Sequence, residues 1–380
     1  MRPPEFYKGR EQTYVKHFFF EKYLQTVAFH IGYSYPEFVC VDGFSGPWRT
    51  VGEDLSDTSF YIALDRLKYV KEGLAAQNKH PAIKAFFVEE DPKSFAALER
   101  AIQEYKGPIQ AIPFRGTFQE NIPKILDATK SAFAFFFIDP TGWTGFSMEG
   151  IKPVLRHGPG EVVINFMYDH INRFLNSTEP SIEASMDLLF GTDKWRSLRD
   201  VREDRENAIV GFYRERIRVV GGFQFVTSTR ILKPTQDRAY FHLVYATRNP
   251  KGIIEFRAVE EKTFAEQERV RRAAKLGALE ERTHQPGLPF ESTPSPQSEV
   301  DRERARQIHR AESRVVTLLQ TRALRYGQLR PQVLEIPLVW ESDLQQILKA
   351  MRDRGKLEIE GLGSRERVIK PPCLLRLLRS

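Results

Sequence analysis

Three carboxylates stand where short apolar runs end, at positions where a sheet protein can do chemistry. Asp42 ends FVCVD, Glu89 ends KAFFVE, and Asp139 follows FAFFFI at the start of DPTGW. The run before Asp139 is too short to span a bilayer and too apolar to alternate between two faces, so it predicts a strand buried on both sides. Ligands of open α/β sheets bind beyond the carboxyl ends of such strands. The three carboxylates are therefore predicted to share one ligand-binding edge.

Glycines follow the first carboxylate in VDGFSGP, where Gly43, Phe44 and Gly46 form a predicted turn. Glycines after a parallel strand let the backbone turn sharply and approach a ligand, while the next helix offers free amide groups. A glycine-rich turn that serves only packing is the alternative. The stretch therefore predicts a ligand-binding turn but does not identify the ligand.

Glu89 occupies the place where a Rossmann-type fold puts the carboxylate that accepts hydrogen bonds from a ribose. It lies 47 positions beyond Asp42, whereas dinucleotide-binding chains place this acid about 20 residues on. The difference predicts an inserted segment and disfavours a nicotinamide oxidoreductase. After the third predicted strand, Thr117 in RGTFQ either borders an adenine or caps a helix.

Asp139 is followed by Pro140, which fixes φ and removes one amide donor, so the motif presents acceptors at the strand end. Such a rim suits a substrate amine or hydroxyl that gives up a proton. Trp143 offers a flat surface on which an extruded base would stack. Packing against the core or rim is the alternative for this side chain.

The composition describes an ordinary protein of 380 residues, 41% hydrophobic and 28% charged, with room for a large domain and a smaller module. The first residues, MRPPEFYKGREQ, lack the apolar core of a signal peptide, and no apolar run approaches the roughly 20 residues of a membrane helix. A cytoplasmic location and no membrane partner are expected. The two cysteines form no Cys-x-x-Cys pair and the eight histidines show no ligand spacing, so no metal is predicted.

Seven strands are predicted in the first 280 residues, and helical stretches separate most of them. The expected strands are 38–42, 84–89, 109–113, 133–138, 161–167, 223–231 and 240–247, and the clearest helices are 59–76, 92–105 and 120–129. The connection between the last two strands is too short for a crossover, so the final strand should run antiparallel. The fold class is predicted as α/β, a Rossmann-like sheet of seven mostly parallel strands with the last one reversed.

A Pro- and Ser-rich stretch at 281–300 predicts a linker between a large domain, 1–280, and a small one, 301–380. Residues 281–380 hold 18 Lys and Arg against 13 Asp and Glu, which is +5 of the net charge of +7. Helices at 300–324 and from Ser342 to Gly355, the second with a Ser342/Gln345 capping box, precede KLEIEGLGSRERVIK, which predicts two strands. This order is typical of a winged helix-turn-helix.

The predicted winged helix would contact DNA or RNA through side chains on the outer face of its second helix and on the wing. These are Gln345, Lys349, Arg352, Arg365 and Arg367. Small modules of this kind also serve dimerisation or protein contact, and a charged face is often only solvated. Nucleic-acid contact and protein contact therefore both stay open for residues 301–380.

Taken together, FFFEKYL, VDGFSGP, DTSFYIAL, FVEEDP, FFFIDPTGW and FHLVYATRNPKGI resemble the three-Cys-motif partner family (TcmP) of bacteria over about residues 10–265. The resemblance implies the class I S-adenosylmethionine methyltransferase fold and an extra segment after Asp42. It implies these cofactor-binding residues: Lys16, Asp42, Gly43, Phe44, Gly46, Glu89 for the ribose, Thr117 for the adenine, and Asp139 facing the methyl group. The family's name also suggests a phage-type partner protein with a three-cysteine motif, which this chain itself lacks.

Two functions follow as hypotheses. The first is a methyltransferase that acts on nucleic acid, with Asp139, Pro140 and Trp143 at the reacting centre. The second is a catalytically inactive binding or scaffold protein with the same fold. The second draws on a departure from adenine-N6 methyltransferases, in which the corresponding run is Asp-Pro-Pro-Tyr, whereas DPTGW lacks the second proline and shifts the aromatic by one position.

Overall fold

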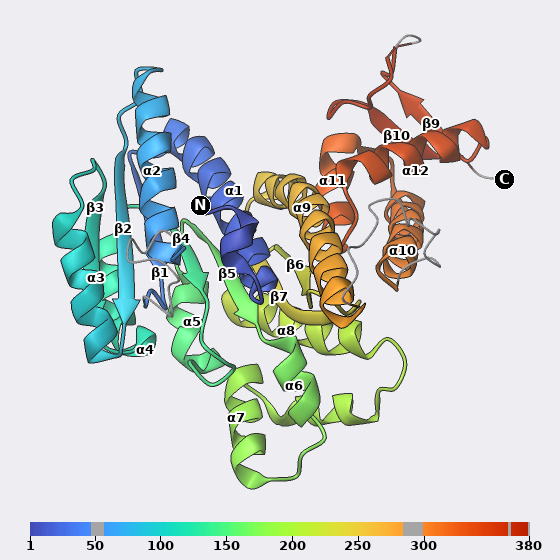
Figure 1. The fold of residues 1–380 in the computed structure, drawn as a ribbon. Helices are drawn as coiled ribbons and strands as arrows, with labels where there is room; N and C mark the ends of the chain where they lie inside the picture. Colours follow the sequence, from blue (N-terminus) through green and yellow to red (C-terminus); the bar gives the residue numbers. More distant parts are fainter. Residues whose placement is uncertain (47–56, 284–298, 364–365, 379–380) are drawn as a thin grey trace.

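The computed structural model describes residues 1–46, 57–283, 299–363 and 366–378. Seven strands form one sheet in the order β3-β2-β1-β4-β5-β7-β6 (Figure 1). Their bounds are β1 Glu37–Asp42, β2 Ala82–Glu89, β3 Gln110–Arg115, β4 Phe133–Ile138, β5 Gly160–Phe166, β6 Phe225–Leu232 and β7 Ala239–Thr247. All seven predicted strands are confirmed, with ends that differ by at most two residues.

Strand direction in the sheet also agrees with the sequence. β1 pairs in parallel with β2 and β4, β2 with β3, and β4 with β5. β7 runs antiparallel to both β5 and β6, as the short connection before it predicts. The carboxyl ends of β1, β2, β3, β4, β5 and β6 therefore lie at one edge of the sheet, together with the β6–β7 hairpin.

Helices cover both faces of the sheet. One face packs against α1, α2, α3 and α9, and the other against α4, α5, α6, α7 and α8 (Figure 1). Their bounds are α1 Glu11–Ser34, α2 Ser59–Ala75, α3 Pro92–Glu104, α4 Phe118–Thr129, α5 Met148–Arg156, α6 Tyr168–Phe174, α7 Pro180–Phe190, α8 Arg205–Gly221 and α9 Pro250–Thr283, with 3₁₀ turns at Pro4–Tyr7 and Asp193–Asp200. The three helices predicted between strands are α2, α3 and α4.

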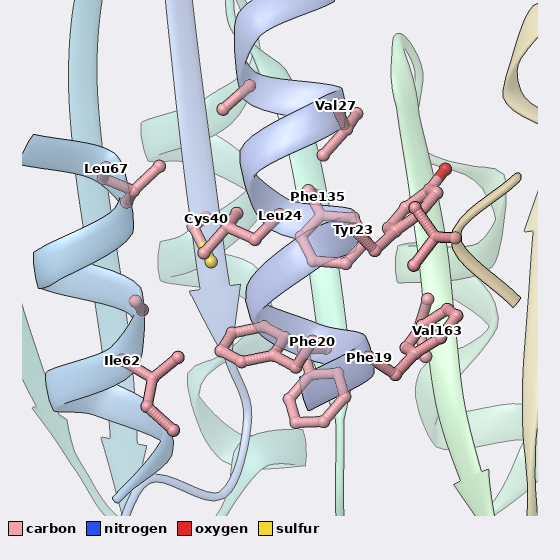
Figure 2. Close-up of a cluster of buried hydrophobic side chains, with 14 of the residues drawn as sticks. Phe19, Phe20, Tyr23, Leu24, Val27, Cys40, Ile62, Leu67, Phe135 and Val163 are labelled. Carbon is pink, nitrogen blue, oxygen red and sulfur yellow. The ribbon is translucent and has the colours of Figure 1, made fainter. Parts of the chain in front are cut away.

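β4 is the central strand of the core, and every one of its residues is buried. Phe133, Phe135 and Phe137 pack on the α1 face, whereas Phe136 and Ile138 pack on the α5 face. Figure 2 shows α1 and α2 laid over the first of these faces. The labelled contacts there are Phe19, Phe20, Tyr23, Leu24 and Val27 of α1 with Cys40, Ile62, Leu67, Phe135 and Val163. The prediction of a strand buried on both sides is confirmed.

Residues 299–378 form a second core around a three-stranded sheet ordered β8-β10-β9. The elements are α10 Glu299–Thr321, β8 Leu324–Arg325, α11 Tyr326–Leu334, α12 Glu341–Asp353, β9 Leu357–Glu360 and β10 Leu374–Leu377. We call this unit the C-terminal module. The second strand of the hairpin lies at β10, beyond the predicted 356–370, because Pro371 and Pro372 must be passed before a strand can form.

The start of α12 corrects a second prediction. Ser342 lies inside the helix, and the cap lies two residues earlier, at Trp340, whose amide donates a hydrogen bond to the Asp343 carboxylate at 2.9 Å. Gln345 is buried at 8% exposure and exchanges two hydrogen bonds with the backbone of Ile369, at 3.0 and 2.9 Å. Gln345 therefore fixes the segment before β10 and does not lie on the outer face of α12.

The C-terminal module packs directly on the large domain through α9 and β6. The Arg257 guanidinium, 1% exposed, pairs with Glu260 of the same helix at 2.6 Å and donates to the Leu334 carbonyl of α11 at 2.7 Å. Glu335 accepts a hydrogen bond from the Val226 amide of β6 at 3.2 Å, and its carbonyl accepts one from Thr227 at 2.8 Å. Buried polar groups thus join the two units, although the predicted linker residues 284–298 lie outside the described part.

Candidate functional site

Asp42 ends β1 as a fully buried carboxylate. Its Oδ2 accepts a hydrogen bond from the Ser59 hydroxyl at 2.6 Å, and its Oδ1 accepts one from the Phe44 amide at 3.1 Å. Burial, with a smaller contribution from the nearby charge of Asp139, raises the pKa of Asp42 to about 6, although the two hydrogen bonds oppose the shift. Asp42 therefore shapes the turn from within and lies close to the second carboxylate.

A testable consequence arises for Asp42→Asn. The folded carboxyl prefers its neutral form between pH 3.8 and about 6, so the wild type loses stability as pH rises through that window while the amide does not. We expect the variant to be more stable above pH 6.5 by about 3 kcal/mol, and the difference to vanish near pH 4. Urea unfolding at several pH values measures it. A difference that is independent of pH would contradict the burial argument.

The glycine turn after β1 brings the backbone against the neighbouring strands. The Gly43 amide donates to the Phe137 carbonyl at 2.9 Å, and the Ser45 amide donates to the Val88 carbonyl at 2.8 Å. A Cβ at Gly43 would meet the ring of Phe118 at 3.1 Å, so a larger residue here requires that ring to shift by a few tenths of an ångström. Gly46 is buried, and residues 47–56 after it lie outside the described part. The predicted inserted segment begins here.

Glu89 ends β2 as a buried carboxylate with 2% exposure. Its Oε1 accepts a hydrogen bond from the Asp91 amide at 2.7 Å, and burial raises its pKa. Glu89 lines a cavity of about 80 Å³ together with Gly43, Phe44, Gly116 and Thr117, which we call the glycine-turn cavity. Four residues predicted to bind the cofactor, Gly43, Phe44, Glu89 and Thr117, therefore line one cavity.

Thr117 has a local structural role in addition to its place on the cavity wall. Its hydroxyl accepts a hydrogen bond from the Glu120 amide at 3.2 Å, and Glu120 accepts one in return from the Thr117 amide at 2.9 Å. This capping box begins α4. Gly116 before it has φ +111°, a conformation that favours glycine. Thr117 also lines a second cavity of about 320 Å³ with Gln119, Thr144 and Ser147, which we call the Ser147 cavity.

Asp139 follows β4 and is held by two side chains. Lys16 of α1 donates to its Oδ2 at 2.5 Å, and Asn165 of β5 donates to its Oδ1 at 2.7 Å. Both partners of the Lys16–Asp139 salt bridge are mostly buried, with side chains 14% and 13% exposed. The Asn165 Oδ1 is buried and has no partner among the described residues. The structure therefore joins Lys16, Asp139 and Asn165 into one polar cluster beside Asp42.

Pro140 and Trp143 follow Asp139 along the chain, and Trp143 contacts α6. Pro140 is buried. Trp143 is half-buried, and its ring lies nearly parallel to that of Phe174 in α6, with centroids 6.3 Å apart and an interplanar angle of 6°. Trp143 does not line the glycine-turn cavity or the Ser147 cavity. Its observed ring partner within the described residues is Phe174, as expected of a packing role.

Sequence reasoning undervalues two residues of the site. From its place at the end of β5, Asn165 is compatible with either the substrate side of the site or a purely structural role, and it holds Asp139. The sequence assigns no role to Ser59, although it donates to Asp42 across 17 positions. Its position directly after the Thr58 N-cap, at the end of the inserted segment, is a signal that places it near the carboxyl ends of the strands.

The predicted nucleic-acid residues lie in the C-terminal module, away from the cluster around Asp139. Arg367 is exposed, and Lys349 is partly exposed on α12. Arg352 pairs with the neighbouring Asp353 at 2.9 Å. Gln345 is turned inward, so its predicted exposure is wrong, and Arg365 lies outside the described residues.

Within the described residues, no group of three or more His, Cys, Asp or Glu side chains is arranged to hold a metal ion. Cys40 and Cys373 are both buried and free. In the same part of the chain, every helix is too short or too polar to cross a bilayer.

Comparison with known proteins does not show a family for this chain. No protein-family model matches the chain, and no curated protein matches it. One solved structure that the chain is similar to is loganic acid methyltransferase with SAH, at 10% sequence identity, covering 75% of this chain and 92% of that chain. The TM-score is 0.31, too low for the likeness to support any conclusion on fold or function. Any functional conclusion for this chain therefore rests on the geometry of the site.

Proposed function

We propose that this chain is an S-adenosylmethionine-dependent methyltransferase related to the three-Cys-motif partner proteins. One observation supports it above the others: Asp42, Glu89 and Asp139 end neighbouring strands β1, β2 and β4 beside a glycine turn. Sheets of this kind bind their ligands at this edge. Six of the predicted cofactor residues, Asp42, Gly43, Phe44, Glu89, Thr117 and Asp139, lie along that edge.

The residues present fit such a cofactor. The buried carboxylate of Glu89 is an acceptor for ribose hydroxyls, and the rings of Phe44 and Phe118 supply apolar walls. The glycine-turn cavity alone is smaller than a nucleoside, but the Ser147 cavity shares Thr117 and Gly145 with it. A nucleoside extending from Glu89 towards Ser147 would occupy both.

The protein itself has few chemical tasks in such a methyl transfer. S-adenosylmethionine supplies a methyl group on a sulfonium, which is already a strong leaving group. Lys16 and Asn165 each donate to one Asp139 oxygen, and each oxygen keeps a second lone pair. Asp139 is thus held in one orientation with capacity to accept a hydrogen bond from a substrate amine or hydroxyl and to take its proton.

Nucleic acid is the proposed substrate. The net charge of +7 favours a polyanion, and the order α10-β8-α11-α12 followed by the β9–β10 hairpin supports a winged helix. Lys349 and Arg367 would then contribute contacts from the exposed surface of the module. A three-cysteine-motif protein as partner rests on the family resemblance alone.

Calorimetry with S-adenosylmethionine tests the cofactor site. We expect binding by the wild type and at least a 10-fold weaker affinity for Glu89→Gln, because an amide accepts fewer hydrogen bonds from two hydroxyls than a carboxylate does. Glu99→Gln, at an exposed site on α3, is the matched control and should bind as the wild type does. Equal affinity of the Glu89 variant would remove that residue from the ribose site.

The second candidate is a scaffold protein of the same fold without catalysis. It is favoured by the Lys16–Asp139 salt bridge, which places an ammonium group on the carboxylate assigned to the substrate. The same calorimetry, followed by transfer of labelled methyl groups to mixed DNA and RNA, separates the two. Absence of binding at millimolar cofactor, or binding without transfer, supports the scaffold.

A further inference from the structure

A charged cavity of about 410 Å³ lies at the carboxyl edge of the sheet, where α10 meets the large domain. Its walls come from Tyr168 after β5, the first turn of α8, Arg230 of β6, the β6–β7 hairpin and α10. We call it the Arg230 cavity. In the sheet, Phe166 of β5 pairs with His242 of β7, and His242 pairs with Arg230 of β6. Phe166 directly follows Asn165, which holds Asp139. The cavity is therefore a close neighbour of the Asp139 cluster.

The lining of this cavity holds four arginines and four carboxylates. Each of these carboxylates is paired with a basic side chain: Asp204 with Arg310, Glu206 with Arg230, Asp237 with Arg271 and Lys275, and Glu303 with Arg306. Arg205 and Arg238 of the lining take no part in these pairs.

Asp169 is almost fully buried, and three basic side chains share it: Lys233 at 3.0 Å, Arg238 at 3.2 Å and Arg173 at 3.3 Å. One carboxylate cannot neutralise three cations. Arg238 lines the cavity and Arg173 shares its carboxylate; they are 53% and 61% exposed, so both charges face solvent.

Arg205 adds a further cation to the wall. It donates to the side-chain oxygens of Asn172 and Asn176 and to the backbone carbonyls of Leu198, Arg199 and Val201, at 2.9 to 3.4 Å. All five acceptors are neutral. The charge of Arg205 is therefore held in place by dipoles and stays available to an anion in the cavity.

Two buried polar atoms at or beside this cavity, one on Arg230 and one on His242, have no partner among the described residues. Arg230 is 7% exposed. Its Nη2 pairs with Glu206 at 2.9 Å, but its buried Nε has no partner among the described residues. His242 binds the other oxygen of Glu206 through Nε2 at 3.0 Å, and its Nδ1 is likewise buried without a described partner. Groups of this kind are uncommon inside proteins unless a ligand or water completes them.

We propose that the Arg230 cavity binds the phosphodiester backbone of a nucleic acid and so holds the substrate strand next to Asp139. Guanidinium groups present planar pairs of donors that match phosphate oxygens. The proposal rests on the nucleic-acid substrate proposed above and names where its backbone lies. Contacts of this type fix position without reading sequence, and α10 forms one wall of the site.

The surface of α12 is the weaker location for this role. Gln345 is buried, and the exposed Arg352 pairs with the neighbouring carboxylate of Asp353, so one predicted contact is lost and a second is partly neutralised. At the Arg230 cavity, by contrast, Arg238 of the lining shares the single carboxylate of Asp169 with Arg173 and Lys233.

The test is fluorescence anisotropy with labelled single-stranded RNA, single-stranded DNA and duplex DNA across a salt series. The variant is Arg173→Gln/Arg238→Gln, which leaves Lys233 on Asp169, so the buried carboxylate keeps a partner. We expect at least 10-fold weaker binding and a salt dependence lower by about two ion equivalents. Arg100→Gln/Lys106→Gln removes the same charge from exposed sites on and after α3 and should change affinity less than 2-fold.

Each other outcome bears on the proposal. Loss confined to a Lys349→Gln/Arg367→Gln variant would overturn it in favour of α12. An equal loss of affinity in the α3 control would show a diffuse charge effect and would overturn the proposal. Displacement of the strand by low-millimolar inorganic phosphate would indicate a site for free phosphate and would also overturn it. Calorimetry with S-adenosylmethionine on the same variant separates this proposal from the proposed methyltransferase function. If the strand binds in the cavity but the cofactor does not bind, the proposed methyltransferase function is contradicted and the proposal for the Arg230 cavity stands.

Discussion

Arg257→Ala is expected to lower the free energy of unfolding by about 3–5 kcal/mol, the usual cost of removing one partner from a buried ion pair. Arg257 is 1% exposed and Glu260 is not exposed at all, so the substitution leaves a carboxylate without its cation inside the protein. It also removes the donor to the Leu334 carbonyl that joins α9 to α11. Urea unfolding followed by circular dichroism measures the change.

Two further variants make the Arg257 result specific. Arg257→Ala combined with Glu260→Gln removes the unpaired charge while keeping an acceptor for the Trp340 indole, which donates to Glu260 at 3.2 Å. We expect it to recover at least half of the lost stability. Arg272→Ala, one residue from the buried Arg271 but exposed, is the control and should be near neutral. An unfolding midpoint unchanged by Arg257→Ala would show that the pair contributes nothing.

Asp139→Asn is expected to reduce methyl transfer by about 100-fold or more at saturating cofactor. The amide has the shape of the carboxylate, but its nitrogen would face a donor in Lys16 or Asn165, and it takes no proton from a substrate. The measurement is incorporation of labelled methyl groups into mixed DNA and RNA under single-turnover conditions. Asp127→Asn, at an exposed site on α4, is the control and should match the wild type.

For Asp139→Asn, the rate of methyl transfer and the affinity for S-adenosylmethionine must be measured separately. If S-adenosylmethionine binds to the variant as it binds to the wild type while transfer falls, Asp139 acts on the substrate. A fall in affinity that accounts for the whole fall in rate would make it a cofactor-binding residue instead. Equal transfer by both proteins at saturating cofactor would remove Asp139 from the reacting centre.

Strand positions and directions were predictable because they depend on local pattern. Alternate residues of β4 pack on opposite faces, and only an unbroken apolar run such as FAFFFI satisfies both. The ends of these strands then fix where Asp42, Glu89 and Asp139 emerge. The reversed β7 could be predicted from the length of one loop.

Partners of the site residues were harder to predict, because they depend on contacts between distant segments. Lys16 and Asp139 are 123 positions apart, and nothing in either local stretch shows that α1 crosses the end of β4. Gln345 was misplaced for a related reason. The polar residues of an amphipathic helix do not show which of them the following chain will cover, and here the segment at Ile369 covers Gln345.

The contacts of Glu335 with β6 have a consequence for the behaviour of the protein in concentrated solution. β3 and β6 are the outer strands of the sheet, and an outer strand with free amides is a template on which another molecule can add a strand. On β3, Pro113 removes one such amide. On β6, the Val226 amide is occupied by Glu335. A contact from the C-terminal module thus occupies one position on this edge that a strand added by another molecule would need.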